Sequence, residues 1–477
     1  MAIRTSEQYR KKLYKMKRNV FINGKVIDRD DAQLENGINT VSTTFDAVTD
    51  PALKDLVTTK SHLSGETVHR YTHVYQSQDD LLKKLKMTRL LCQRVGGCVQ
   101  RCMAVDTLNA IGITSKEIDD KYGTVYHQNF LKYLKYYQEN DLVGNAAQTD
   151  PKGDRSKRPS KQVDPDLYLR VVEKKSDGIV VRGAKVHNSI APYSDELMVV
   201  PTRAMTPEDS DWALSFIIPS DTDGVKLICR ATAPRPRLHL DAPYNHYGLV
   251  DSVTVFDNVF VPWERVFMCG EHEFAGRLAL SFANFHRHSY CGCKPAVTDI
   301  VMGATALVAD YNGVGTAPHI REEVADLMAL AETVYACGVA AALTGTKSSS
   351  GIFEPNAIYS NCGRYLAGKN IYHEYDILAA TAGGWPATMP PEEDWFNEKT
   401  KDYLNKYIMR NPNVSADDQH RLFRFISDFS CSAVSGVWQY AGVHGGGSPV
   451  MERIGLRAQY DLESRKKMVQ YLAGIKT

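Results

Sequence analysis

Two cysteines in the first quarter of the chain have a spacing that could serve a metal centre. Cys98 and Cys102 occur four residues apart in GGCVQRCMAVD. The apolar spacing from Leu81 to Ile111 predicts one long amphipathic helix over this segment. Residues four apart share a helix face, so both thiols could bind one metal. Taken alone, two cysteines at this spacing are more often buried core residues than ligands.

A second pair of possible ligands lies far along the chain, in FHRHSYCGCKPAV. His286 and Cys293 are seven residues apart, about two helical turns, and would also share a face. Two helices that each offer two ligands complete a four-coordinate site. Three thiolates and one imidazole suit structural zinc or an iron–sulfur cluster with one histidine ligand. Spacing alone leaves both open.

The same helix face carries two groups that could move protons. Tyr290 and Lys294 come four and eight residues after His286. A phenol and an ammonium beside a metal ligand could donate protons or hydrogen bonds to an oxyanion. The plainer interpretation is a tyrosine and a lysine on a helix surface. His288 and Cys291 fall on other faces and are interpreted as core or surface residues.

Changes in the hydrophobic period divide the 477 residues into three regions. Residues 1–145 are expected to be mainly helical, with a capping box at Thr5 and Gln8 and a hairpin at VFINGKVI, where Asn23-Gly24 favours a two-residue turn. Residues 146–273 hold short β-type runs typical of an antiparallel sandwich or barrel. Residues 274–477 return to helical segments, near 276–312, 319–346, 356–380 and 415–440. This order predicts an α+β chain in three domains.

Composition argues for an ordinary soluble protein. A hydrophobic content of 43%, a charged content of 24% and a formal charge of +1 give no general attraction to nucleic acid or membrane. The ten cysteines are too few for a disulfide scaffold, and no secretory signal opens the chain. The apolar stretch Leu327 to Gly345 is interrupted by Glu332 and rich in small residues, which predicts a buried helix rather than a membrane span. We expect a cytoplasmic protein that binds neither nucleic acid nor membrane.

Long blocks of the sequence resemble the 4-hydroxybutyryl-CoA dehydratase (vinylacetyl-CoA isomerase) family. Its wider relatives include the flavin-dependent 4-hydroxyphenylacetate 3-hydroxylases and the acyl-CoA dehydrogenase fold. The likeness covers nearly the whole chain, and its strongest blocks are KMTRLLCQRVGGCVQRC, IDDKYGTVYHQNFLKYLKYYQENDL, TDPKGDR, DPDLYLRVVEKKSDGIVVRGAKVH, VFDNVFVP, HRHSYCGCK, ADYNG, TAGG and HGGGSP. The resemblance implies an acyl-CoA dehydrogenase-like fold, with an N-terminal helical domain, a middle β domain and a C-terminal helical bundle, assembled as a homotetramer (a dimer of dimers).

The resemblance also implies two cofactors. In the family, the positions that match Cys98, Cys102, His286 and Cys293 hold a 4Fe-4S cluster, which the hydroxylases lack. FAD is implied at three segments. The backbone amides and two cationic side chains of TDPKGDR suit a polyanion. A second segment, 187–189, is expected to lie along the flavin, and the flavin can closely approach the small-residue turn 382–384. The implied flavin-binding residues are Thr149, Asp150, Pro151, Lys152, Gly153, Asp154, Arg155, His187, Asn188, Ser189, Ala382, Gly383 and Gly384.

The implied reaction is the radical dehydration of 4-hydroxybutyryl-CoA, or a closely related hydroxyacyl-CoA thioester, to crotonyl-CoA, with vinylacetyl-CoA Δ-isomerase activity. This reaction must remove a β-hydrogen, which the carbonyl group does not directly make acidic. In the family mechanism, loss of the α-proton and one-electron oxidation by flavin make the β-hydrogen acidic. Loss of the β-proton then leaves a ketyl radical anion, which expels hydroxide while the cluster acts as a Lewis acid. The implied catalytic residues are His286, Tyr290, Lys294 and Asp251.

Three positions depart from the family pattern. Asp251 stands where a glutamate precedes VFDNVF, and Ser189 stands where a threonine lies near the flavin. A glutamate expected shortly before HGxGSP is absent from WQYAGVHGGGSP, with Ala441 nearest its place. A different hydroxyacyl thioester, or isomerisation alone, therefore stays open.

Two other functions also stay open. A two-component flavin monooxygenase of the 4-hydroxyphenylacetate type would act on a phenol and would need no cluster. A non-catalytic scaffold that binds structural zinc would need no flavin.

Overall fold

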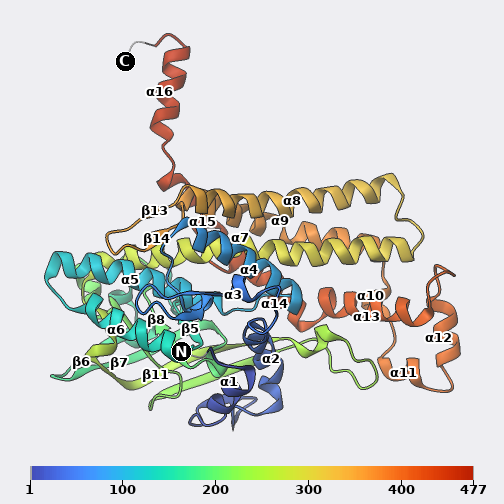
Figure 1. Cartoon of the computed structure of the whole chain (residues 1–477), viewed down its shortest axis with the longest axis horizontal. Helices are drawn as coiled ribbons and strands as arrows, with labels where there is room; N and C mark the ends of the chain where they lie inside the picture. The colour runs from blue at the N-terminus through green and yellow to red at the C-terminus, as the bar shows by residue number, and fades with distance from the viewer. Residues whose placement is uncertain (1–2, 476–477) are drawn as a thin grey trace.

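The computed structural model describes residues 3–475 as helices packed against two β-sheets (Figure 1). The larger sheet has the strand order β2-β1-β10-β11-β7-β6, and the smaller sheet β12-β9-β8-β5. Two short hairpin sheets, β3-β4 and β13-β14, lie among the helices. The strands are β1 (Val20–Ile22), β2 (Lys25–Ile27), β3 (Thr58–Lys60), β4 (Thr67–His69), β5 (Gly144–Ala147), β6 (Arg170–Lys174), β7 (Gly178–Ser189), β8 (Glu196–Val199), β9 (Leu214–Pro219), β10 (Val225–Thr232), β11 (Leu249–Pro262), β12 (Val266–Cys269), β13 (Thr346–Lys347) and β14 (Phe353–Glu354).

The hairpin predicted in the first region forms, and it extends the larger sheet. Val20 pairs with Ile27 across the turn, where Asn23 and Gly24 have φ values of 52° and 75°, the left-handed geometry of a tight two-residue turn. β1 then pairs parallel to β10, and β5 pairs parallel to β8. The other described pairings in the two large sheets are antiparallel, as expected. The first region therefore contributes strands to both sheets.

The longest strand pairing positions part of the candidate site. β7 and β11 run antiparallel, with Asp251 opposite Ser189 and Ser252 opposite Asn188. Inward-facing residues of these strands, such as Phe256, join residues of β8 and β9 in one buried core between the sheets. Helices α5 (Cys102–Tyr122) and α6 (Tyr126–Glu139) contact the smaller sheet through β5 and β12. The polar ends of β7 and β11 are thus held by a fully packed sheet.

A helical bundle is built around α7 (His272–Tyr311), which packs against α8 (Pro318–Leu343), α9 (Ala357–Ala382) and two N-terminal helices, α4 and α5. α7 and α8 are long and apolar enough to cross a membrane by length and composition alone. The most apolar 18-residue segment of α7 is 67% buried, whereas that of α8 is only 28% buried. The expectation of a buried helix at Leu327 to Gly345 is therefore met only in part, and α8 leaves an apolar face exposed that includes Met328 and Leu343.

The single helix predicted across Leu81 to Ile111 is wrong, because two helices meet there. α4 (Gln78–Val95) ends at Gly96, which has a φ of 68°, the left-handed conformation that glycine adopts freely. α5 (Cys102–Tyr122) begins after a loop. A Cβ on Gly96 would lie 2.5 Å from the Tyr244 ring, and one on Gly97 would lie 2.5 Å from the Trp438 ring. Cys98 therefore lies in the loop, not on one helix face with Cys102.

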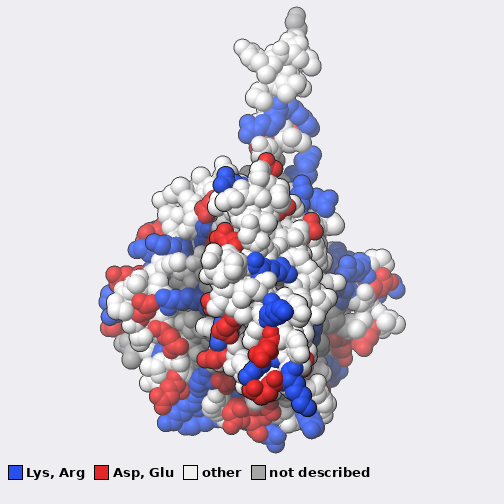
Figure 2. All heavy atoms as spheres, turned by 90° about the vertical axis from the view of Figure 1, so that its right-hand side faces the viewer, with Lys and Arg blue, Asp and Glu red and all other residues white. Residues whose placement is uncertain are grey.

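The helix predicted over residues 415–440 is also divided. α13 (Ala416–Cys431) ends at Ser432, whose extended backbone caps α14 (Ala433–His444). The chain continues into α15 (Pro449–Gln459) and then α16 (Leu462–Leu472), which projects from the body (Figure 1) and buries none of its residues. Figure 2 shows pale side chains at the tip of this arm above a band of Lys and Arg, and both charge signs interspersed on the body below.

The remaining helices are shorter, and α1 begins as predicted. Thr5 Oγ1 accepts a hydrogen bond from the Gln8 amide, and the Gln8 side chain accepts one from the Thr5 amide, which completes a capping box. These helices are α1 (Ser6–Leu13), α2 (Ala32–Asp46), α3 (Lys54–Val57), α6 (Tyr126–Glu139), α10 (Trp385–Thr388), α11 (Glu392–Phe396) and α12 (Lys401–Ile408).

Candidate functional site

Three cysteine thiols meet where the loop before α5 passes the middle of α7. The Cys98 thiol hydrogen-bonds with those of Cys102 and Cys293, and Cys102 also interacts with the imidazole of His286. Cys102 and Cys293 are buried, while Cys98 is half-buried. The four predicted ligands, which come from two distant parts of the sequence, are brought together.

The crowded thiols resist ionisation in the bare protein. The hydrogen bond with Cys98, followed by burial, raises the pKa of Cys102 well above that of a free thiol. The hydrogen bond with Cys98 lowers the pKa of Cys293, but burial and the neighbouring thiols Cys92 and Cys102 outweigh it, so that pKa is also raised. Cys92 is buried against Cys98. A bound metal would reverse this preference, because metal ions bind the thiolate form.

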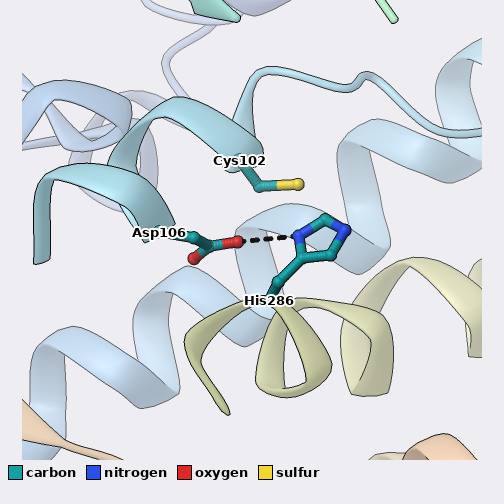
Figure 3. Close-up of side chains that lie close together, drawn as sticks. All are labelled: Cys102, Asp106 and His286. Atoms are coloured by element: carbon teal, nitrogen blue, oxygen red, sulfur yellow. Dashed lines mark hydrogen bonds and ion pairs between the residues drawn. The ribbon is translucent and has the colours of Figure 1, made fainter. Parts of the chain in front are cut away.

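The fourth group, His286, is oriented by a carboxylate. Its Nδ1 lies 3.1 Å from Oδ2 of Asp106, and Figure 3 shows this contact with the Cys102 sulfur beside the ring. One ligand atom from each of Cys102, Asp106 and His286 lies within 4.8 Å of the others. Because a carboxylate accepts a hydrogen bond, Nδ1 carries a proton and Nε2 is the nitrogen left to bind a metal, the arrangement found for most metal-bound histidines.

Asp106 was not predicted, and it is the centre of a buried polar network. Its Oδ1 lies 3.1 Å from the Lys84 ammonium, and both side chains are completely buried. Its Oδ2 also accepts a hydrogen bond from Ser289 Oγ at 2.7 Å. Lys84 donates to the Phe285 carbonyl on α7 as well. A lone acid in the apolar run CMAVDTLNAI, one turn after Cys102, is the sequence signal that could have identified it.

This network changes the protonation of His286. Burial alone lowers the pKa of a histidine, but the hydrogen bonds and charges of Asp106 and Cys102 outweigh burial and raise the pKa of His286 to about 9. In the bare protein His286 is therefore mostly protonated at neutral pH. Metal binding at Nε2 would displace that proton.

Tyr290 lies on the His286 side of α7, as the spacing predicted. The two rings are in edge contact, with centroids 5.5 Å apart. The Tyr290 hydroxyl donates a hydrogen bond to the Ala441 carbonyl at 2.7 Å, and the Arg364 guanidinium lies 4.6 Å from the centre of its ring. Burial, the largest cause, raises the pKa of Tyr290 although Arg364 lowers it. The phenol is therefore kept neutral as a proton donor.

The glycine-rich turn after α14 is fitted around this tyrosine. Two arginines from the bundle donate to its backbone: Arg364 to the Gly445 carbonyl at 2.6 Å and Arg287 to the Gly446 carbonyl at 2.9 Å. A side chain at Gly445 would overlap the Tyr290 hydroxyl. The block HGGGSP thus closes one side of the site, and sequence reasoning missed both arginines that hold it.

Lys294, the second predicted proton donor, is buried in an ion pair. Its Nζ lies 3.0 Å from Oε2 of Glu374 on α9, and Thr298 Oγ1 donates to the same oxygen at 2.9 Å. Glu374 is completely buried, and its Oε1 has no hydrogen-bond partner among the described residues. Glu374 lies 80 residues after Lys294, so no local spacing could have indicated it.

The segment from Thr149 to Arg155 carries a cluster of cations. Partial burial, and then the positive charges of Arg155, Lys185 and Arg203, lower the pKa of Lys152. Asp150, in contrast, forms an ion pair in which its Oδ1 lies 2.6 Å from Nζ of Lys185. Gly153 has a φ of 53° and turns the chain there. A group of cations at an exposed turn fits the phosphates of a dinucleotide.

Three further residues predicted for flavin lie at the end of β7, next to Asp251. Ser189 Oγ donates to Asp251 Oδ1 at 2.5 Å, and burial, the largest cause, raises the pKa of Asp251. Lys152, Asp251 and His444 are the ionisable neighbours of His187. Asn188 Nδ2 donates to Thr254, but its buried Oδ1 has no partner among the described residues. These residues, the cationic turn and the end of α14 therefore face a common region.

The small-residue turn formed by Ala382, Gly383 and Gly384 lies elsewhere. It ends α9, where Gly383 has a φ of 71°, and the Thr381 carbonyl before it accepts a hydrogen bond from Asn312 at the end of α7. In Figure 1, α10, which follows this turn, lies on the opposite side of the molecule from β5, which precedes Thr149. One chain does not bring these two predicted flavin segments together.

Comparison with known proteins assigns both halves of the chain. Residues 5–268 match the family described as 4-hydroxyphenylacetate 3-hydroxylase N terminal, and residues 275–474 match 4-hydroxyphenylacetate 3-hydroxylase C terminal. A 4-hydroxybutyryl-CoA dehydratase/vinylacetyl-CoA-Δ-isomerase from Clostridium aminobutyricum is 40% identical over 487 aligned positions, which cover 99% of each chain.

Two solved structures have the same overall fold. An oxygen-tolerant archaeal 4-hydroxybutyryl-CoA dehydratase from N. maritimus superimposes with a TM-score of 0.96 at 33% identity, covering 100% of this chain and 96% of the other. The oxygenase component of 4-hydroxyphenylacetate 3-monooxygenase, complexed with FAD, gives a TM-score of 0.88 at 22% identity, covering 98% of each chain. The second likeness is one of fold.

Proposed function

Because the chain belongs to the 4-hydroxyphenylacetate 3-hydroxylase family and, within it, to the 4-hydroxybutyryl-CoA dehydratase family, we propose that it dehydrates 4-hydroxybutyryl-CoA, or a closely related hydroxyacyl-CoA, to crotonyl-CoA by a radical mechanism. Isomerisation of vinylacetyl-CoA is the accompanying activity. The 40% identity to such an enzyme over the whole chain supports this proposal. The observation that carries it is the convergence of Cys98, Cys102, His286 and Cys293.

Two cofactors belong to this proposal, a 4Fe-4S cluster and FAD. Three thiols, of which that of Cys98 contacts the other two, and the imidazole of His286 suit the cluster. Cys98 comes from the loop before α5, and the other three groups come from α5 and α7. The cations around Lys152 and the unpartnered Oδ1 of Asn188 suit the phosphates and a donor group of FAD. When bound, FAD would exchange one electron with the substrate and the cluster would act as a Lewis acid toward its hydroxyl group.

The side chains around the thiols have defined tasks in this proposal. His286 takes a substrate proton at Nε2 when that atom is not bound to metal, and Asp106 holds the other proton at Nδ1. Tyr290, kept neutral, donates a hydrogen bond or proton from its hydroxyl group. Lys294 contributes a fixed positive charge beside the developing oxyanion. Asp251, beside Ser189, is a carboxyl group with a raised pKa near the flavin segment.

The active assembly is proposed to be a homotetramer, a dimer of dimers, in the cytoplasm. Three observations favour contact with further copies. α8 leaves an apolar face exposed and α16 buries none of its residues. The turn at Ala382, Gly383 and Gly384 lies away from the cationic turn of its own chain, so it could meet flavin only in a neighbouring copy.

The substrate follows from the family, with one open choice. Asp251 and Ser189 retain the chemistry of the residues that the family pattern leads us to expect, a carboxyl and a hydroxyl group. Ala441 does not, since it offers only its carbonyl, which is bound by Tyr290. We propose an acyl-CoA thioester as the substrate class and use the assay below to separate dehydration from isomerisation alone.

Anaerobic purification with quantification of iron, sulfide and flavin tests the cofactors. About four irons and four sulfides with one flavin per chain are expected for this cofactor set. Turnover is then measured separately with 4-hydroxybutyryl-CoA and vinylacetyl-CoA. Flavin without iron, together with hydroxylation of a phenol, would establish the monooxygenase instead. Stoichiometric zinc without flavin would establish the scaffold, for which Cys102, Asp106 and His286 offer a three-ligand site.

A further inference from the structure

Arg364 is a fully buried arginine that contacts both the glycine-rich turn and the Tyr290 ring. It lies on α9 and is 0% exposed. Its Nε donates to the Gly445 carbonyl at 2.6 Å, and its Nη2 donates to the Val443 carbonyl at 2.8 Å. Its guanidinium carbon lies 4.6 Å from the centre of the Tyr290 ring. One planar group therefore holds two peptide oxygens and a phenol ring at the same time.

The same turn accepts the hydroxyl group of Tyr290. The Ala441 carbonyl accepts hydrogen bonds from the Tyr290 hydroxyl at 2.7 Å and from the Gly445 amide at 2.8 Å. A Cβ at Gly445 would overlap the phenol oxygen, so the turn fits closely against it. The hydroxyl proton can rotate about the C–O bond, but the position of the oxygen is set by the ring and the turn. Arg364 contacts both.

We propose that Arg364 is the positioning residue for Tyr290. By binding the carbonyls of Val443 and Gly445, it holds the turn against the phenol, so the hydroxyl oxygen keeps one position beside the His286 ring. This inference rests on the proposed function, in which Tyr290 donates a proton or hydrogen bond to the substrate. It adds a residue on a third helix, α9, to the groups that α7 and α14 supply.

Glu452 anchors Arg364 from α15. Its Oε1 lies 3.1 Å from Nη2 of Arg364, and the two side chains are 2% and 0% exposed. A guanidinium removed from water needs a counter-ion close to it. Because α15 follows the glycine-rich turn in the chain, the ion pair and the two carbonyl contacts tie α9, the turn and α15 together at one side chain.

Arg364→Lys separates the shape of this side chain from its charge. A guanidinium can bind carbonyls through its fork of N–H groups while it stacks on a ring, whereas an ammonium group is a point charge on a flexible stem. The variant keeps a cation for Glu452 but cannot hold the two carbonyls and the ring together. In the holoenzyme, kcat with vinylacetyl-CoA is expected to fall at least about tenfold, the scale of one lost general acid. KM should stay within about twofold, because the lost contact acts in the transition state.

A double-mutant cycle with Tyr290→Phe distinguishes positioning from general stability. If Arg364 acts through the phenol hydroxyl, little remains to be lost once that hydroxyl is absent. Arg364→Lys is therefore expected to lower kcat less than about twofold in the Tyr290→Phe background. A purely structural role would lower kcat by the same factor in both backgrounds.

Gly445→Ala disturbs the same contact from the turn and leaves Arg364 in place. Gly445 has a φ of −65°, which alanine adopts without strain, while the added methyl group would overlap the Tyr290 oxygen. The variant is expected to lower kcat in wild type and by a smaller factor in Tyr290→Phe. It tests the same contact if Arg364→Lys fails to fold.

Backbone hydrogen exchange gives a readout that does not depend on turnover. Amides in residues 441–449 are expected to exchange several-fold faster in Arg364→Lys, because the turn opens more often when its carbonyl contacts are lost. Iron and flavin contents are measured on the same samples and should match those of wild type.

The matched control is Arg70→Lys. Arg70 is 2% exposed, donates to the Leu56 and Thr58 carbonyls at 2.7 and 2.9 Å, and pairs with Asp80 at 3.1 Å. It thus makes the same kinds of contact as Arg364, in another part of the chain. The control should lower Tm but leave kcat and the exchange of residues 441–449 unchanged.

The outcomes separate this inference from the proposed function. If wild type turns over neither thioester, the proposed function is wrong, and hydrogen exchange alone decides whether Arg364 holds the turn. If wild type is active, three results would overturn the role of Arg364: a wild-type kcat in Arg364→Lys, an equal loss of kcat in the Tyr290→Phe background, or an unchanged kcat in Tyr290→Phe itself. Loss of iron or flavin in Arg364→Lys would also overturn it, because the residue would then support a cofactor.

Discussion

His286 and Asp106 are joined by a buried contact in which Nδ1 of the imidazole lies 3.1 Å from Oδ2 of the carboxylate (Figure 3). The carboxylate is also paired with Lys84, which is as deeply buried. His286 is thus fixed in one orientation before any metal binds. A pre-set imidazole lowers the entropy lost when the site is filled.

Replacing Asp106 should therefore weaken the metal site without removing a ligand. Asp106→Asn keeps the size of the side chain but leaves Lys84 without a counter-ion, and one amide oxygen replaces the two carboxylate oxygens that Lys84 and His286 use. Loss of such an outer partner typically costs about 10- to 100-fold in metal affinity or activity. Retained iron per chain during dialysis against a chelator measures the effect. Wild-type retention of iron would show that Asp106 does not orient His286.

Cys293→Ala should abolish the broad visible absorbance of an iron–sulfur cluster and dehydration together, while flavin remains bound. The matched control is Cys291→Ala, two residues earlier on α7, where the thiol is buried near Cys337 and Gly363 instead of the candidate ligands. Both variants are purified anaerobically and analysed for iron and sulfide. Retention of absorbance and activity in Cys293→Ala would remove Cys293 from the site.

Tyr290→Phe should retain both cofactors and slow turnover at least about tenfold, the scale of one lost general acid. The ring keeps its contacts with His286 and Arg364, and only the hydroxyl bound to the Ala441 carbonyl is lost. The measurement is kcat with vinylacetyl-CoA, alongside flavin and iron contents. An unchanged kcat would rule out a proton donated by Tyr290.

The cofactor-free protein should lose stability as pH rises from about 6.5 to about 8. The folded-state pKa of His286 is about 9, above the ordinary value of 6.5, so its charged form stabilises the fold below pH 6.5 and that contribution falls as pH increases. The loss across this window is about 2 kcal/mol. Urea unfolding at the two pH values measures it, and the loss should shrink in Asp106→Asn. Equal losses in the two proteins would assign the effect to other groups.

Lys152→Gln should lower flavin content or affinity by about tenfold, since one desolvated charge-assisted contact with phosphate is lost. Lys157→Gln is the matched control, because that lysine lies on the same turn and pairs with Asp154 at 3.3 Å in an exposed ion pair. Flavin released by denaturation is quantified for both. A similar flavin content in the two variants would place the phosphates elsewhere.

The sequence predicts the ligand-bearing part of α7 well because His286, Tyr290, Cys293 and Lys294 follow a regular helical period. It predicts the α4–α5 boundary poorly, since two glycines inside an amphipathic pattern lower helix propensity without forbidding a helix. The break depends on the rings of Tyr244 and Trp438, which come from much later in the chain.

The partners of the site residues were harder to predict than the residues themselves. Asp106 and Glu374 act through contacts with Lys84, His286 and Lys294 that join separate helices. No local period relates such residues, because tertiary packing sets their distances. The family resemblance indicated the site residues themselves, and the structure was needed to identify the charged side chains that contact them.

The close fit of Trp438 over Gly97 also concerns how the protein is made. The loop that carries Cys98 is packed against an indole ring on α14, so it takes its final form only after α14 has been synthesised and has docked. A cluster held by Cys98 would therefore reach its final surroundings only once α14 has docked.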